Sequence, residues 1–283
     1  MTFDVSVETP RSLAHAYALL AEAAYRPIAG GTDLMVQLAA DLAEPPARVL
    51  DLWRLDELRG IDYDGYEVSV GALTTYTHIR HSPVIRARLP ALEEAAATVG
   101  AAQIQNRGTI GGNICNASPA GDTLPVLLAV DATLDLGSLD GGRSVAASAF
   151  WTGYRQTAMR PDELLLRIRF PVERHRRTRF RKVGTRRAQA ISKVVMALSY
   201  REDGGVWRDV RLALGSVAPT PVRAHETERV LEGAAPRETV ADHAASVLAE
   251  ELAPIDDVRS TADYRRSVSA RVLHRLLREE GEW

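Results

Sequence analysis

The sequence predicts an α+β fold with two domains: a first domain of mixed helices and strands, and a smaller second domain in which an antiparallel sheet is followed by helices. Three observations lead to this prediction. Two Asp-Gly-Gly turns, at 140–142 and 203–205, each join segments with the apolar pattern of strands. From residue 226 onwards, apolar residues recur at helical spacing. The charge also changes sign, because residues 1–150 hold 10 basic and 18 acidic residues whereas residues 151–283 hold 25 and 19.

Each element of the first domain is predicted from its local pattern. Apolar residues at helical spacing, with Ser12 as the N-cap, indicate a first helix. Alternation in YEVSVGAL indicates a half-buried strand, and Pro171 ends a strongly apolar one. The predicted order is a helix at 11–25, a short strand before the glycine pair 30–31, a helix from Leu34 that Pro45 and Pro46 end, strands at 47–52 and 66–73, helices at 74–80 and 89–99, a strand hairpin within 127–148, and a strand at 163–173.

The second domain is predicted to begin near 171–179, where both the charge and the apolar pattern change. Two antiparallel strands within 191–219 are expected first, followed by helices near 226–232, 238–252 and 261–281. We therefore divide the chain into a first domain at 1–172, with two subdomains at about 1–55 and 56–172, and a second domain at 173–283.

Composition narrows the class of protein. The chain of 283 residues is 46% apolar and 25% charged, which is ordinary for a globular protein. Its single cysteine excludes an internal disulfide and a cysteine-ligated iron–sulfur cluster within the chain. The first residues do not have the pattern of a signal peptide, and no run reaches the ~20 apolar residues of a membrane span. We expect a cytoplasmic protein.

The most basic stretch is RHRRTRFRKVGTRR at 174–187, with eight Arg or Lys and no acidic residue. Such a run is typical of nucleic-acid binding. A solvated strand and hairpin is the simpler interpretation, because the whole chain carries a net charge of −2. A face toward an anionic cofactor or a partner subunit is a third. Only two lysines, Lys182 and Lys193, accompany 33 arginines, so each is a candidate for a role that needs a compact ammonium group.

Two glycine-rich segments are candidate binding loops: AGGTDL at 29–34 and RGTIGGNICNASPAGD at 107–122. Glycine lets backbone N–H groups approach an anion closely, and hydroxyl and amide side chains add donors. Two such loops that converge can hold a pyrophosphate from both sides. Each segment alone is also typical of an ordinary turn.

The sequence indicates no metal ligand and no catalytic acid or base. It contains neither the G-x-G-x-x-G fingerprint nor a P-loop, and its seven histidines include no H-E-x-x-H. His78 and His81 can share a helix face, but a surface pair is the simpler interpretation without a third ligand. Cys115 follows Ile114 with no adjacent base, so a small buried apolar residue is favoured over a nucleophile.

Four segments together resemble the flavoprotein (medium) subunit of molybdenum hydroxylases, the family of the FAD subunits of bacterial xanthine and carbon monoxide dehydrogenases. They are AGGTDLMVQL, IQNRGTIGGNICNASPAGDTLPVLLAVDATL, GYRQTAMRPDELLLRIRFP and FRKVGTRRAQAISKV, and they occur in the family's order over nearly the whole chain. The resemblance implies an FAD-binding module with two subdomains, of the vanillyl-alcohol-oxidase type, followed by a smaller α+β domain.

The resemblance also implies a function in electron transfer. A large subunit with molybdopterin and a small subunit with two [2Fe–2S] clusters would deliver electrons to FAD in this chain. NAD+, oxygen or a quinone would then receive them, in an assembly expected to be a dimer of heterotrimers without nucleic acid. Two other functions remain open: a stand-alone FAD oxidase or dehydrogenase of the same fold, and a non-catalytic nucleotide-binding protein.

The resemblance further implies which residues bind FAD. The two glycine-rich segments would hold the pyrophosphate, and Asp122 would accept from the ribityl chain or fix its loop. Lys182 would lie beside the isoalloxazine ring and stabilise the anionic reduced flavin. Segment 184–191 would lie by the flavin face. The implied contacts are Ala29, Gly30, Gly31, Thr32, Asp33, Leu34, Thr109, Gly111, Gly112, Asn113, Asn116, Ser118, Asp122 and Lys182, with Val70 and Gly71 as a wall and Leu164 or Leu165 near the ring.

Two positions depart from the family pattern. Gln105 stands where relatives usually have Arg, which bears on how the second glycine-rich segment is anchored. Gln189 or Ala190 stands where an acidic residue is frequent, which bears on how the flavin meets NAD+ or oxygen.

Overall fold

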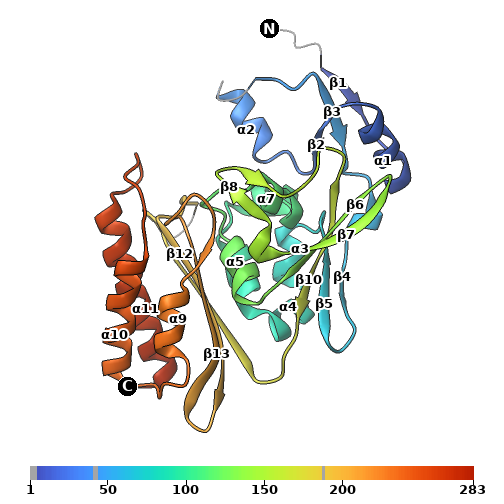
Figure 1. The fold of residues 1–283 in the computed structure, drawn as a ribbon. Helices are drawn as coiled ribbons and strands as arrows, with labels where there is room; N and C mark the ends of the chain where they lie inside the picture. Colours follow the sequence, from blue (N-terminus) through green and yellow to red (C-terminus); the bar gives the residue numbers. More distant parts are fainter. Residues whose placement is uncertain (1–4, 41–43, 187–188) are drawn as a thin grey trace.

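The computed structural model describes residues 5–40, 44–186 and 189–283 (Figure 1). In these residues, three sheets and one small hairpin are flanked by helices. The N-terminal part lies at the top of Figure 1, and the largest sheet lies at the right. The third sheet, with the C-terminal helices outside it, lies at the left.

The N-terminal part is a small parallel sheet with two helices. Its strands lie in the order β1 (Ser6–Glu8), β3 (Arg48–Asp51) and β2 (Arg26–Ile28). Helix α1 (Leu13–Glu22) begins as predicted at Ser12, whose hydroxyl accepts from the His15 N–H at 3.2 Å. The first glycine-rich segment follows β2 and leads into α2 (Leu34–Ala39), which buries none of its side chains. This sheet therefore presents the glycine pair at the end of one of its strands.

The second sheet is antiparallel and has β10 at its centre. The order is β4 (Ile61–Tyr63), β5 (Glu67–Gly71), β10 (Leu164–Pro171), β6 (Thr133–Ser138) and β7 (Gly141–Ala146). Ile168 of β10 lies opposite Val70 on one side and Leu134 on the other, and all three side chains are fully buried. This apolar face anchors the start of β10, where Leu164 and Leu165 lie.

Short helices and a hairpin complete the first domain. The helices are α3 (Tyr76–His81), α4 (Pro83–Arg88), α5 (Pro90–Thr98), α6 (Ala102–Arg107), α7 (Ile110–Asn116) and α8 (Leu124–Ala129), with 3₁₀ turns at Asp56–Leu58 and Ala147–Ala149. The hairpin joins β8 (Trp151–Gly153) to β9 (Gln156–Thr157) and lies beside α7 in Figure 1.

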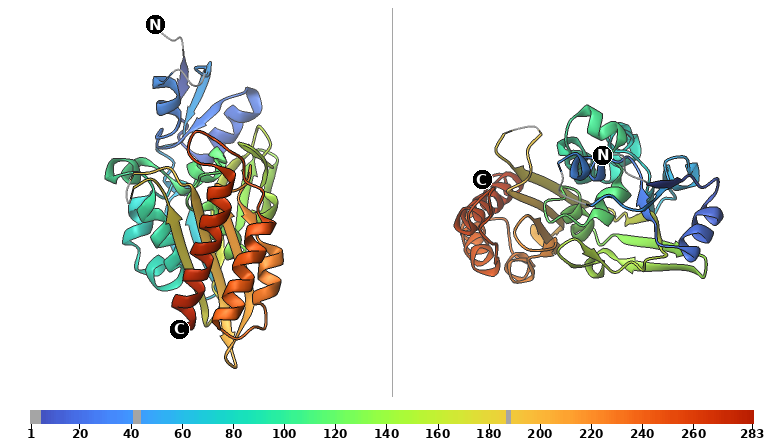
Figure 2. Two further views of the ribbon diagram at one scale, coloured as in Figure 1. Left: turned by 90° about the vertical axis from the view of Figure 1, so that its left-hand side faces the viewer. Right: turned by 90° about the horizontal axis from the view of Figure 1, so that it is seen from above.

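The C-terminal sheet is antiparallel, in the order β11 (Arg176–Val183), β12 (Val194–Asp203), β13 (Val206–Gly215) and β14 (Val222–Arg223). Figure 2 shows α9 (His225–Leu231), α10 (Glu238–Glu251) and α11 (Ala262–Gly281) on its outer face. Strand β12 is buried on both faces: Met196 and Leu198 pack in the core with these helices, whereas Val195 packs in the core of the first domain. Phe180 of β11 and Ala213 of β13 also belong to the core of the first domain, so the C-terminal sheet packs against both domains.

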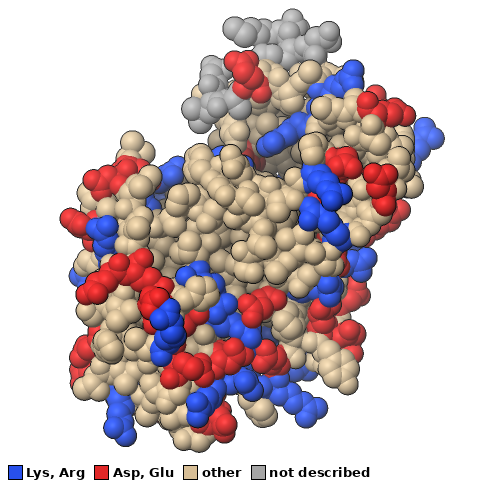
Figure 3. Space-filling view, in the orientation of Figure 1, with Lys and Arg blue, Asp and Glu red and all other residues tan. Residues whose placement is uncertain are grey.

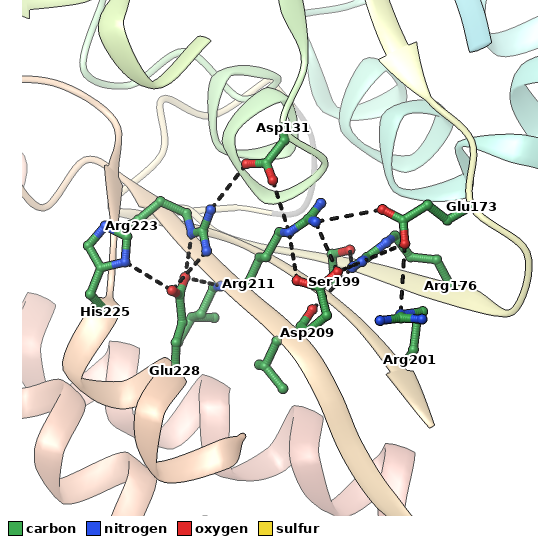
Figure 4. Close-up of polar contacts among 12 residues, drawn as sticks. Asp131, Glu173, Arg176, Ser199, Arg201, Asp209, Arg211, Arg223, His225 and Glu228 are labelled. Atoms are coloured by element: carbon green, nitrogen blue, oxygen red, sulfur yellow. Dashed lines mark hydrogen bonds and ion pairs between the residues drawn. The ribbon is translucent and has the colours of Figure 1, made fainter. Parts of the chain in front are cut away.

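A network of charged side chains also joins the two domains (Figure 4). Asp131, at the end of α8, lies 3.1 Å from the Arg211 guanidinium and 3.3 Å from that of Arg223. Glu173, in the connection before β11, pairs with Arg176 at 2.9 Å. Because several opposite charges share partners here, the network holds the second domain in one orientation better than an isolated surface pair would.

The α+β fold class is confirmed by this mixture of helices and mainly antiparallel sheets. The Asp203-Gly204-Gly205 turn and the three C-terminal helices lie where they were predicted. Two predictions were wrong. Ile110–Asn116, expected as loop, is helix α7, because Thr109 caps it through a hydrogen bond from the Gly112 N–H at 3.1 Å. Residues 127–129, expected to open a hairpin, belong to the fully buried helix α8 (Leu124–Ala129), because a short apolar run shows neither the helical nor the strand period clearly.

Residues 176–183 of the basic run form strand β11. Arginine side chains of β11 form ion pairs with carboxylates from other elements. Arg177 lies 3.5 Å from Glu202, and Arg179 pairs with Glu280 at 2.5 Å. On the face drawn in Figure 3, basic and acidic side chains are interleaved over the lower part of the molecule. The simpler interpretation, a partly solvated strand, therefore describes this segment better than a patch for nucleic acid.

Candidate functional site

A deep cleft of about 530 Å³ lies between the N-terminal parallel sheet and the helices of the first domain. Both glycine-rich segments line it, together with Leu164 and Leu165 from the start of β10. The volume is within the range of small-molecule sites. The two segments, about eighty positions apart in the sequence, thus converge on one cavity, as the pyrophosphate hypothesis requires.

The first segment approaches the second through its backbone. A Cβ on Gly30 would lie 1.7 Å from the Arg107 carbonyl oxygen, so only glycine fits there. Gly31 has φ +74°, in the left-handed region that favours glycine. Among the described residues, none accepts a hydrogen bond from the backbone N–H groups of Gly30, Gly31, Thr32 or Asp33. Four successive unpaired donors beside a cleft fit an anionic group, because a partly buried N–H needs an acceptor.

The second segment contributes space and side chains more than backbone donors. Its N–H groups are used within the protein: that of Gly111 donates to the Ala72 carbonyl at 2.9 Å, and that of Gly112 donates to the Thr109 hydroxyl. A Cβ on Gly111 would lie 2.6 Å from the Ala72 carbonyl oxygen, whereas one on Gly112 would meet only the Thr109 hydroxyl, at 3.0 Å. Gly111 therefore serves packing, and Gly112 leaves room in the cleft.

Thirteen of the residues implied by the resemblance line the cleft: Ala29, Gly30, Gly31, Thr32, Asp33, Leu34, Thr109, Gly111, Gly112, Asn113, Asn116, Leu164 and Leu165. The other five do not line it. Val70 is fully buried in the core, and a Cβ on Gly71 would lie 2.4 Å from the Leu58 carbonyl oxygen. Ser118 accepts from the Ala120 N–H at 3.3 Å. Asp122 and Lys182 face each other between the domains.

Asp122 and Lys182 form a buried pair between the two domains. The Lys182 ammonium lies 2.6 Å from the Asp122 carboxylate and donates to the Thr98 carbonyl at 3.1 Å. The hydroxyls of Ser192 and Thr98 also donate to this carboxylate. Burial raises the pKa of Asp122, while the Lys182 charge and the three donors act against that rise. The pair thus links β11 to the second glycine-rich segment.

The resemblance also placed segment 184–191 by the flavin face. Within 184–191, Arg187 and Ala188 lie outside the described residues.

Several cleft residues were not found from the sequence. Arg26 and Arg160 line the cleft and bring positive charge to it. Glu163 also lines it, but the Arg143 guanidinium binds both its oxygens, at 2.6 and 2.8 Å, and lowers the pKa of Glu163. Basic residues after a short apolar stretch are frequent everywhere in this arginine-rich sequence, so no local signal distinguished these arginines.

Cys115 lines the cleft instead of being buried in the core. Its sulfur lies 3.6 Å from that of Met159. The surrounding cleft walls raise the pKa of the thiol to about 12, while the charge of Arg26 opposes the rise. The thiol is therefore protonated at neutral pH, which disfavours a nucleophilic role.

Gln105, where the family pattern usually has Arg, is buried and fully engaged. Its oxygen accepts from Arg80, and its amide nitrogen donates to the carbonyls of Ala97 and Val99 at 3.3 and 3.0 Å. It thereby ties α6, which precedes the second glycine-rich segment, to α3 and α5. In the described part of the loop after β11, Gln189 has φ +52° and its carbonyl accepts from Arg186.

The described residues include neither a cluster of metal ligands nor a membrane-spanning helix. No group of three or more His, Cys, Asp or Glu side chains is placed there to hold a metal ion. No helix in the described ranges is long and apolar enough to cross a membrane.

The chain matches two protein families and many known proteins. Residues 3–173 match the family described as FAD binding domain in molybdopterin dehydrogenase, and residues 179–280 match the CO dehydrogenase flavoprotein C-terminal domain. The glyceraldehyde dehydrogenase medium chain of Sulfolobus acidocaldarius is 36% identical, over 86% of this chain and 86% of its own length. The carbon monoxide dehydrogenase medium chain of Afipia carboxidovorans is 34% identical, over 95% of this chain and 93% of its own.

Two solved structures have nearly the same fold. A carbon monoxide dehydrogenase structure from Hydrogenophaga pseudoflava matches with a TM-score of 0.92 at 32% identity, over 97% of this chain and 96% of the other. Quinoline 2-oxidoreductase from Pseudomonas putida 86 matches with a TM-score of 0.93 at 29% identity, over 100% and 99%.

Proposed function

We propose a function for this chain from the premise that it belongs to the family of FAD-binding subunits of molybdopterin dehydrogenases. FAD is its cofactor, and the chain is the flavoprotein subunit of a multi-subunit oxidoreductase. We propose that electrons pass from a molybdopterin-containing large subunit through the [2Fe–2S] clusters of a small subunit to the FAD in this chain. From FAD they would pass to an acceptor such as NAD+, oxygen or a quinone. The relatives' names, medium chain and FAD-binding subunit, support an assembly of this kind.

The observation that carries the proposal is the unpaired run of N–H groups at the end of β2. FAD brings a pyrophosphate with two negative charges, and its flavin supplies the redox chemistry when it is bound. The N–H groups from Gly30 to Asp33 would donate to the phosphate oxygens, and Arg26 and Arg160 would balance their charge. Leu164 and Leu165 offer an apolar surface for an aromatic ring at the same cleft. The residues present therefore fit the cofactor.

The chain's own residues bind and orient the cofactor rather than transfer protons. Of the ionisable cleft residues, Glu163 is paired with Arg143, Asp33 lies 3.7 Å from the Arg155 guanidinium, and Cys115 stays protonated. None of these three is placed to act as a base at neutral pH. We propose that Lys182 lies near the flavin edge of the cleft, because its partner Thr98 precedes Val99, which lines the cleft.

The test is to purify the full chain and record its visible spectrum before and after FAD is added. We expect a yellow protein, or a colourless one that takes up one FAD per chain. A folded protein that binds no FAD would contradict the proposal. Co-purification with a cysteine-rich small subunit and a large molybdopterin subunit would test the proposed assembly, and NAD+, oxygen and quinone can then be compared as acceptors.

A further inference from the structure

Arg155 connects the two glycine-rich segments from outside the cleft. Its Nη1 lies 2.7 Å from the Asn116 Oδ1 atom, at the end of α7, and 3.7 Å from the Asp33 carboxylate, before α2. Asp33 and Asn116 both line the cleft, whereas Arg155 does not. One guanidinium thus contacts a side chain from each segment without occupying the space between them.

The position of Arg155 is determined by the β8–β9 hairpin. The indole N–H of Trp151 donates to the Ile114 carbonyl at 3.1 Å, and this buried contact fastens the hairpin to α7. Arg155 lies in the two-residue turn with φ +53°, so its side chain leaves the hairpin over the end of that helix. By contrast, α2 buries no side chain. Among the described residues, the ion pair with Arg155 therefore connects Asp33 of the first segment to the β8–β9 hairpin.

We propose that Arg155 is a positioning residue for FAD, which neutralises Asp33 and turns the amide of Asn116 so that its nitrogen donates into the cleft. Arginine has only donors, so it can bind only the oxygen of the Asn116 amide, and the NH₂ group must then face away from it. The Asp33 carboxylate accepts a hydrogen bond from the neutral amide of Gln37, which leaves its charge uncompensated. That charge would repel the pyrophosphate, and the Arg155 guanidinium offsets it. The inference rests on the proposed function, because it needs an anionic ligand in the cleft.

The size of the effect depends on whether the cofactor is bound. Without it, Arg155 and Asp33 have 39% and 46% of their side chains exposed, and ion pairs at such positions contribute little to stability. A bound cofactor excludes water and strengthens both the pairing and the repulsion that replaces it when Arg155 is removed. We therefore expect the loss of Arg155 to affect FAD affinity far more than the stability of the cofactor-free protein.

The experiment measures FAD affinity and dissociation in the full chain by flavin fluorescence. We expect Arg155→Ala to weaken FAD binding about tenfold, the effect of one charge-assisted hydrogen bond, with thermal unfolding of the cofactor-free chain nearly unchanged. The same substitution in an Asp33→Asn background should weaken binding less, because there is no charge left to neutralise. Arg155→Lys, which keeps the charge, should lose less than Arg155→Ala. Arg174→Ala removes an exposed arginine of the second domain and is the control for net charge.

Four results would overturn the inference. Equal FAD affinity of Arg155→Ala and the wild type would show that the contact has no role in binding. If Arg155→Ala lowers FAD affinity equally in the wild-type and Asp33→Asn backgrounds, Arg155 does not act by neutralising Asp33. If Arg155→Ala does not fold, the affinity of Arg155→Lys for FAD is compared with that of Asn116→Ala, which lacks the amide that Arg155 contacts. An affinity of Arg155→Lys as low as that of Asn116→Ala would contradict a role for the charge at position 155. A wild-type chain that binds no FAD refutes the proposed function itself, and this inference with it.

Discussion

Replacing Gly112 by valine separates cofactor binding from folding. Gly112 lies on α7 and faces the cleft, and an added Cβ would meet only the Thr109 hydroxyl within 4 Å, at 3.0 Å. That hydroxyl can move by a few tenths of an ångström. The isopropyl group, in contrast, must extend into the space where the cofactor is proposed to lie. We expect Gly112→Val to fold and to lose FAD.

The magnitudes follow from these contacts. Within a helix, valine is a few tenths of a kcal/mol more favourable than glycine, and the close contact with Thr109 offsets this gain. The free energy of unfolding of the cofactor-free chain should therefore change by less than about 1 kcal/mol. For FAD, a side chain in its place should weaken binding by at least ~100-fold, or about 2.7 kcal/mol.

The assay is titration of the cofactor-free chain with FAD, together with denaturant unfolding followed by circular dichroism. Gly111→Ala is the matched control, because its Cβ would lie 2.6 Å from the Ala72 carbonyl oxygen and 2.7 Å from the Ala72 Cβ. It should lower stability although it adds less volume than valine at Gly112. If Gly112→Val binds FAD as tightly as the wild type, the second glycine-rich segment does not contact the cofactor.

Three further predictions concern other residues of the site. Lys182→Ala should leave FAD bound but lower its reduction potential, because a cation near the ring is lost; an unchanged potential in a redox titration would place Lys182 away from the flavin. Alkylation of Cys115 by a maleimide should slow when FAD is added, because Cys115 lines the cleft. In the cofactor-free chain the rate should rise about tenfold per pH unit between pH 7 and 9, because a pKa of about 12 keeps most of the thiol protonated over that range. Equal rates with and without FAD would argue against cofactor in this cleft. Arg143→Gln should destabilise the chain by about 1–2 kcal/mol at pH 7. Because the pKa of Glu163 is lowered in the folded state, this difference should vanish as the pH falls through that pKa. A difference in the free energy of unfolding that stays constant while Glu163 becomes protonated would refute the pairing.

The elements that were predicted well are those with a strong local signal. The turn at Asp203-Gly204-Gly205 needs residues that accept positive φ, and both glycines have it, at +61° and +76°. The helices α10 and α11 are long enough for their apolar spacing to be read without ambiguity. Helices α7 and α8 were missed because they are short, and α7 contains two glycines that lower its helix propensity.

The sequence alone determined the fold class, the two glycine-rich segments and the family resemblance, because these depend on local pattern and on residue order. Only the tertiary structure decided which residues share the cleft. It brought Arg26 and Arg160 to the cleft, turned Val70 into the core, and placed Arg155 across both segments. Such contacts join positions far apart in the chain, and their geometry depends on how sheets and helices pack. A local sequence pattern does not predict which way a side chain points after the sheets and helices have packed.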